Sequence, residues 1–416
     1  MGLVAAKWRL AKMKKIERYL YSLFFIFLCL GQGQKIPPIF PSHWLPTDLS
    51  IYFSDFAALL IAVIFVYRLL SGKSRLPSPT KNHTFLIFLA FIGSTIISLL
   101  ANLSWLNPKE IFLSMLYLLR FLVYLISILS FITERERIFS FFARPQLIAT
   151  GGLLIALIGL TQFFLFPDMR HLEELGWDAH YFRLTAPFLD PDFTGIILVL
   201  FFLFILEHSK KIKQKNILLA IIGLAIILTF SRASLLSLGI GAGIICFFQK
   251  KIKIFLKIMI LILIFTASVS FFLQKSFGGA GTDMKRITTV QARIEANQTA
   301  IILFLKRPLL GIGFNTYPYA KNKLLHQPLD LKNHSRFSPP NSLLLVLATT
   351  GMVGFSFFLL LIRQLFLQAK KTAARKSFLL LAVLNALLVH SLFSNTLFHL
   401  PTITLASIVT SFKDEK

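Results

Sequence analysis

Long apolar runs, separated by short polar stretches, repeat along most of the chain. A run of about 20 apolar residues is long enough to cross the hydrocarbon core of a bilayer as a helix. The pattern predicts an all-α polytopic membrane protein with about twelve transmembrane helices. These helices are expected near 19–33, 51–70, 84–104, 111–132, 146–167, 193–207, 216–231, 232–249, 254–273, 341–362, 377–396 and 398–412.

One long polar segment interrupts this pattern between the ninth and tenth runs. It predicts a division into transmembrane helices 1–9 (residues 1–273), a long outer loop (274–340), and helices 10–12 with a cytoplasmic tail (341–416). Apolar residues at helical spacing after Val290 predict that the loop is partly helical, with a helix lying on the membrane surface.

Basic residues set the expected orientation. The chain holds 44 Lys and Arg against 18 Asp and Glu, a net charge of +26. If the N-terminus is cytoplasmic, 28 basic residues fall on cytoplasmic segments and five on short outer loops, as the positive-inside rule requires. Both termini are therefore expected in the cytoplasm. Topology and the lipid bilayer explain most of the charge, so nucleic-acid binding is not required.

The long loop carries an excess of positive charge that topology does not explain. Ten basic residues there face only three acidic ones, which suggests an anionic ligand on the outer face. The two cysteines both lie in apolar runs, so the sequence offers no disulfide framework and no zinc spacing. No motif for a metal or for another cofactor is present.

The stretch "RPLLGIGFNTY" follows the amphipathic part of this loop. It begins at Arg307, and Pro308 should end the preceding helix, while Gly311 and Gly313 allow a tight turn. A plain loop is the alternative.

The next apolar run reads "NSLLLVLATTGMVG". Its Asn341 can cap the helix or meet a ligand, and its two glycines can serve close helix packing.

Two further arginines lie at expected outer ends of spans. "TFSRAS" places Arg232 between two apolar runs, where it either binds a polar partner or reaches the lipid headgroups. "HYFRLTAPFLDPDFTG" places Arg183 and Asp192 in a proline-containing polar loop. Arg120 alone lies at membrane depth, as a functional residue or in an internal ion pair, for instance with Asp55.

Taken in order, these segments resemble the bacterial O-antigen ligase and O-antigen polymerase family. The resemblance rests on Arg183 with "PFLDPDFTG", on "TFSRASLLSLGIG", and on Arg293 followed by "RPLLGIGFNTY" and "NSLLLVLATTGMVG". It covers 180–360 most strongly. It implies a membrane glycosyltransferase that acts on oligosaccharide linked to undecaprenyl pyrophosphate, at the outer face of the bacterial cytoplasmic membrane. The implied acceptor is a glycan, the lipid A core or a protein hydroxyl.

The chain departs from the family at one position. Ligases of this family usually carry a histidine directly before the asparagine of this stretch, where the chain has Pro340. His334, six residues upstream, is the candidate catalytic base; His326 is the other histidine nearby, and a polymerase would not need this residue.

Arginine guanidinium groups suit phosphate geometry, so Arg183, Arg232, Arg293 and Arg307 are candidate pyrophosphate ligands. Asn341, Gly311, Gly313 and Asp192 are expected to support the site. The rival hypothesis is a transporter or flippase of a lipid-linked glycan or another anionic solute, since twelve spans with both termini inside is a common transporter layout. The matching interrupted spans typical of repeat-built transporters are not seen in the sequence.

Overall fold

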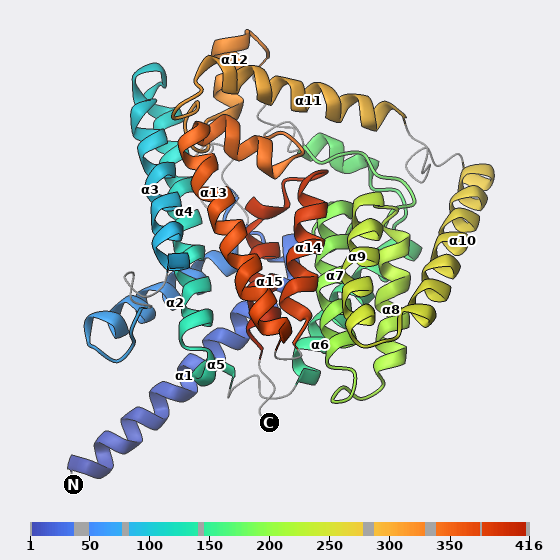
Figure 1. Cartoon of the computed structure of the whole chain (residues 1–416), viewed down its shortest axis with the longest axis horizontal. Coiled ribbons are helices and arrows are strands. Elements are labelled where there is room, and N and C mark those ends of the chain that lie inside the picture. Colours follow the sequence, from blue (N-terminus) through green and yellow to red (C-terminus); the bar gives the residue numbers. More distant parts are fainter. Residues whose placement is uncertain are drawn as a thin grey trace.

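The computed structural model describes residues 2–36, 50–76, 83–139, 145–277, 287–328, 338–374 and 377–412. Every regular element in these ranges is a helix, which confirms the all-α prediction (Figure 1). The α-helices are α1 (Gly2–Leu30), α2 (Phe53–Leu70), α3 (His83–Ala101), α4 (Pro108–Thr133), α5 (Arg135–Phe139), α6 (Pro145–Leu165), α7 (Pro191–Glu207), α8 (Lys215–Leu228), α9 (Arg232–Phe248), α10 (Ile252–Phe277), α11 (Ile287–Lys306), α12 (Tyr317–Leu325), α13 (Ser342–Ala374), α14 (Leu379–Ser391) and α15 (Leu400–Ser411).

The lengths of these helices bear on the number of membrane spans. Six helical segments of the described ranges are long and apolar enough to cross a membrane: Phe53–Leu70, His83–Trp105, Pro108–Thr133, Pro145–Leu165, Phe255–Leu273 and Ser342–Ala373. The apolar helices α8, α9, α14 and α15 have 14, 17, 13 and 12 residues, which at about 1.5 Å per residue fall short of a hydrocarbon core about 30 Å thick. The chain is a multi-pass membrane protein, and twelve spans remain a prediction.

Helix α7 forms the centre of the bundle. Its residues from Thr194 to Phe201 are all buried, as expected for a helix that is apolar on every side. It packs against α6, α8, α9, α14 and α15. Pro191 at its first position and Asp190 as its N-cap fix where the helix starts. Residues at that end are therefore held in place by the core.

The charge at membrane depth belongs to an internal ion pair. The Arg120 Nε atom on α4 lies 2.9 Å from Asp55 Oδ1 on α2. The Tyr124 hydroxyl contacts the same oxygen at 3.0 Å, and the Tyr52 backbone N–H donates to Asp55 Oδ2. The ion-pair alternative for Arg120 is thus correct.

Helix α11 runs across one end of the bundle, at a steep angle to α9 and α14 (Figure 1). Helix α12 follows at the same end and is tied to the start of α4, where Lys323 Nζ lies 2.5 Å from Glu110 Oε2. The long loop is thus partly helical in its described residues. Whether this end faces the outside of the cell remains a prediction.

Helix α13 is broken at Gly351, where the backbone has φ 64° and ψ −167°. A break leaves backbone C=O and N–H groups without partners inside the helix, and such groups are costly in an apolar environment. The segment 308–313 supplies those partners through four backbone hydrogen bonds: Ile312 N to Ala348 O (2.9 Å), Gly313 N to Thr349 O (3.1 Å), Met352 N to Pro308 O (2.8 Å) and Val353 N to Leu309 O (3.2 Å).

The contact also explains two glycines of the sequence motifs. A Cβ atom on Gly311 would overlap the Thr349 carbonyl, and one on Gly351 would overlap the Leu309 carbonyl. The two backbones approach too closely for any side chain. The Ser98 hydroxyl on α3 donates to the Thr349 carbonyl at 2.5 Å, and just after α3 the Asn102 amide donates to the Gly311 carbonyl at 3.0 Å.

We expect Gly351→Ala to destabilise the protein by roughly 2–4 kcal/mol, because the substitution adds an overlap to a backbone conformation that only glycine adopts readily. Thermal unfolding in detergent measures the loss. Gly93→Ala in the adjacent α3 is the control, since nothing lies within 4 Å of a Cβ there. Equal unfolding temperatures for the two variants would show that the break at Gly351 does not need glycine.

Candidate functional site

Asp192 lies at the centre of a polar cluster at the N-terminal end of α7. Its Oδ1 accepts a hydrogen bond from the Ser231 hydroxyl at 2.5 Å. Its Oδ2 lies 2.8 Å from Arg293 Nη2 and 3.3 Å from the Ser394 hydroxyl. Four segments of the chain therefore meet at one carboxylate.

Arg293 reaches the cluster from α11, the helix that crosses the end of the bundle. Its side chain remains 28% exposed although one nitrogen pairs with Asp192. A guanidinium has five N–H donors, so one such contact does not use all of them. Arg293 can hold Asp192 and still present donors to a ligand.

The start of α9 forms another side of the cluster. Ser231 caps this helix by accepting from Ser234 N, and half-buried Arg232 is its first residue. The N-termini of α7 and α9 both lie at the Asp192 carboxylate, where helix dipoles stabilise negative charge. The structure thus brings Arg232 to the same end of the bundle as Arg293.

Arg183 is buried beside the start of α9. Its Nε donates to the Thr229 carbonyl at 3.0 Å, and Nη2 lies 3.5 Å from the Phe230 carbonyl. Its positive charge, like that of Arg293, also stabilises the charged form of Asp192. These bonds support the turn between α8 and α9, where Phe230 has a positive φ of 49°. Arg183 therefore belongs to the cluster and also shapes its wall.

His390, at the end of α14, is fully buried on the inner side of the cluster. One ring nitrogen lies 3.2 Å from the Ser234 hydroxyl and the other 2.6 Å from that of Thr396. Sequence patterns alone do not predict that His390, Ser234, Ser394 and Thr396 lie here. The one available signal is the polar run 394–396 between apolar segments.

Asp190 and Asp192 have different electrostatic environments. Burial, and then the negative charge of Asp192, raise the pKa of Asp190 to about 7. Its Oδ1 accepts from the backbone N–H groups of Asp192 and Phe193. Asp190 thus keeps its proton to a higher pH than a free carboxyl group does, while the arginines favour the charged form of Asp192.

A cavity of about 270 Å³ is connected to the cluster through one ring contact, between His399 and Phe193. His399 lies on its wall and stacks on Phe193, the residue after Asp192, with ring centroids 4.0 Å apart. The Asn315 side chain also lines it, and its buried Nδ2 has no hydrogen-bond partner among the described residues. The ion-paired Arg120 lies on its wall too, and about half of the other lining residues are aromatic: Tyr52, Tyr117, Phe121, Tyr124, Phe188, Phe314 and Phe398.

Other candidate residues lie apart from the cluster or have structural contacts. Arg307 is exposed beyond the C-terminus of α11, about 20 Å along the helix from Arg293. Asn341 caps α13 by accepting from Leu343 N and Leu344 N, at 2.9 and 3.2 Å. Gly313 donates a backbone hydrogen bond to the broken helix α13, and the Gly311 backbone lies in close contact with it. His334 lies outside the described residues.

The described residues contain no group of three or more His, Cys, Asp or Glu side chains that could hold a metal ion. The cluster instead combines arginines, aspartates, hydroxyls and one histidine. These groups can bind an anion and exchange a proton.

The region that contributes Arg232 and Arg293 matches a known protein family. Residues 217–359 match the family model described as O-antigen ligase. This part of the chain is similar to the O-antigen ligase family. A comparison with curated proteins found no match. The O-antigen ligase segment runs from α8 into α13, includes the break at Gly351, and confirms the resemblance found in the sequence.

The match supports an O-antigen ligase-like enzymatic function in polysaccharide biosynthesis. The match covers about a third of the chain and leaves out Asp192 and His390. The cluster thus joins the O-antigen ligase segment to elements on either side of it.

We expect Asp190→Asn to raise the unfolding temperature at pH 8, and to raise it less at pH 5. The folded-state pKa of about 7 exceeds the unfolded value near ~4, so the wild type loses stability as pH rises between the two. Asparagine caps α7 as well as aspartate but carries no charge. Thermal unfolding at both pH values measures the difference.

Asp168→Asn is the control for this measurement. Hydrogen bonds from Arg170 lower the pKa of exposed Asp168 to about 2, so it stays charged at pH 5 and at pH 8. Its substitution should have the same effect at both. An Asp190→Asn effect that is equal at pH 5 and pH 8 would contradict the raised pKa.

Proposed function

We propose that this protein transfers an oligosaccharide from a polyprenyl pyrophosphate to an acceptor hydroxyl, at the end of the bundle where α11 lies. One observation carries the proposal. Arg293, from the O-antigen ligase segment, is held by Asp192 at a site that also contains Arg183 and Arg232. A polyprenyl pyrophosphate is an amphiphile, so its tail stays in lipid while its phosphates need cations at the membrane surface.

In this reaction, negative charge develops mainly on the leaving pyrophosphate. The bond between the anomeric carbon and the pyrophosphate oxygen breaks, and its electron pair stays on that oxygen. The acceptor oxygen forms the new bond to the anomeric carbon and loses its proton. Arg293 and Arg232 supply positive charge where the pyrophosphate leaves, which lowers the barrier. The N-terminus of α9 also stabilises the negative charge of the leaving pyrophosphate.

The proton of the acceptor needs a base with a pKa near the working pH. His334 remains our prediction for that base. Asp190, the N-cap of α7 two residues before Asp192, has a pKa raised to about 7 and is a second candidate. His390 is engaged on both ring nitrogens by Ser234 and Thr396, so we assign it a positioning role.

The aromatic cavity beside the cluster is the proposed place for part of the substrate. Its walls offer flat apolar faces, and Asn315 offers an amide N–H₂ group for a hydroxyl. A volume of about 270 Å³ accommodates a group of the size of one sugar ring. The cavity thus provides room next to the charged residues.

The test uses purified protein with a lipid-linked oligosaccharide, with and without an added acceptor glycan. We expect a new glycosidic product and release of polyprenyl pyrophosphate. Repeated extension of the same glycan identifies a polymerase, and single transfer to the added acceptor identifies a ligase. Movement of intact lipid-linked glycan across vesicles, with no new bond, would support the transporter alternative instead.

We expect Arg293→Ala to lower the transfer rate by about ten-fold or more, since a charge-assisted hydrogen bond to phosphate contributes about 1.5–3 kcal/mol. Arg293→Lys should recover only part of the rate, because an ammonium group cannot make a bidentate hydrogen bond to a phosphate. Lys306→Ala, which removes an exposed charge from the end of the same helix, is the matched control. If Arg293→Ala and Lys306→Ala both retain the wild-type rate, Arg293 is not a pyrophosphate ligand.

A further inference from the structure

A second charged cavity lies at the other end of α4 from α12. Helix α4 starts beside Lys323 of α12 and ends at Thr133, which lines a cavity of about 540 Å³. Its 26 residues span about 39 Å, so the cavity is remote from the end of the bundle where α11 and α12 lie. Residues from the end of α2, the end of α4 and α5 surround it.

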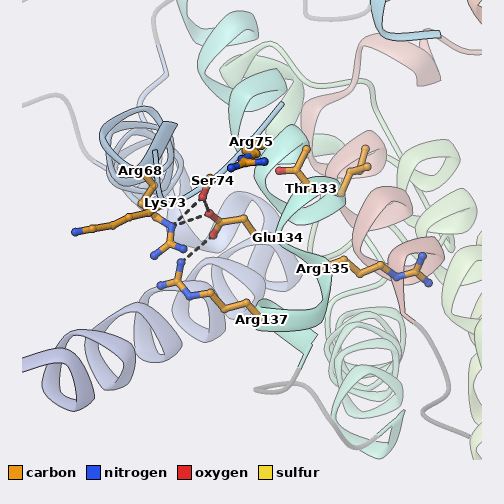
Figure 2. A pocket seen from close by; sticks show the side chains of 9 residues that line it. Arg68, Lys73, Ser74, Arg75, Thr133, Glu134, Arg135 and Arg137 are labelled. Carbon is orange, nitrogen blue, oxygen red and sulfur yellow. Dashed lines mark hydrogen bonds and ion pairs between the residues drawn. The ribbon is translucent and has the colours of Figure 1, made fainter. Parts of the chain in front are cut away.

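An ion-pair network forms one wall of this cavity. Arg68, Ser74 and Arg137 all point toward Glu134 (Figure 2). Arg68 Nε lies 2.6 Å and Arg137 Nη1 3.0 Å from the Glu134 carboxylate, and the Ser74 hydroxyl contacts it too. Glu17 of α1 pairs with Arg137 and lies 3.9 Å from Arg68. The two arginines and the two glutamates of this network therefore have no net charge together.

The remaining charged side chains on the lining are all cationic. Lys73 and Arg75 are exposed in the turn after α2, and Arg135 lies at the start of α5. In Figure 2, Lys73 and Arg135 extend to opposite sides, and Arg75 and Thr133 lie on the same side of Glu134. Lys73 and Arg75 thus give the lining a positive excess, together with hydroxyl groups. Such groups suit a phosphate.

Exposed apolar side chains lie beside this charged cavity. Ile132 lines it and is 51% exposed, and on α2 Tyr67 and Leu70 are 55% and 84% exposed. They continue an exposed apolar stripe along α2 that includes Phe56, Leu60 and Val63. A ligand that binds here can place a charged group in the cavity and apolar chains along the stripe.

We propose that this cavity binds the phosphate-bearing headgroup of an anionic phospholipid from the adjacent leaflet. The positive-inside pattern accounts for the number of cations in these loops, but not for their position around a cavity that borders an apolar stripe. Basic pockets between membrane helices are suited to such headgroups. A free phosphate would use the same cations but would gain nothing from Ile132, Tyr67 and Leu70.

The test measures lipid binding to the purified, delipidated full chain by native mass spectrometry. Phosphatidylglycerol, phosphatidylcholine with the same acyl chains, and glycerol phosphate are added separately. We expect phosphatidylglycerol to bind the wild type at least about ten-fold more tightly than phosphatidylcholine, and high salt to weaken its binding.

The variant Lys73→Ala/Arg75→Ala should bind phosphatidylglycerol about ten-fold or more weakly, since each cation near an anionic lipid contributes roughly five-fold. Both residues are exposed and outside the Glu134 network, so the variant should fold, and its unfolding temperature without lipid checks this. Lys210→Ala/Lys213→Ala removes two exposed charges from the turn between α7 and α8 and should bind like the wild type.

Equal phosphatidylglycerol affinity in the wild type and both variants would overturn the proposal. It also fails if glycerol phosphate binds the wild type as tightly as the lipid does, because the site would then hold a free anion.

Discussion

The broken helix α13 imposes the main physical constraint on this end of the molecule. Backbone groups freed at Gly351 need new partners in an apolar environment, and the segment 308–313 is placed to supply them. Because that segment directly follows α11, the same hydrogen bonds fix one end of the helix that crosses the bundle. The position of Arg293 therefore depends on a backbone contact well away from its own side chain.

The other part of α11 is held by charge. Asp192 lies at the start of the buried helix α7, where the core fixes its position, and it binds Arg293 across the cluster. Its carboxylate also needs Ser231 and Ser394, so α9 and the segment after α14 converge on it. A half-buried carboxylate is stabilised by such partners, and this need gathers the arginines at one site.

The sequence predicted the helices well because apolar runs in a membrane protein have few other ways to satisfy their backbone. It did not predict the break at Gly351, which depends on a contact with residues about 40 positions earlier. Asp192 and Arg293 were each recognisable as candidates, yet 101 residues separate them and no local pattern shows that they meet. The place of His390 in the cluster was not predicted either, since a histidine at the end of an apolar helix is usually a packing residue.

The coupling between Asp192 and Arg293 is the most direct measure of this account. A double-mutant cycle on the transfer rate, with Asp192→Asn, Arg293→Ala and the double variant, isolates it. If Asp192 acts by positioning Arg293, the double variant should be about as slow as Arg293→Ala alone. If the two losses instead multiply, the residues act independently, and the carboxylate does not position the arginine.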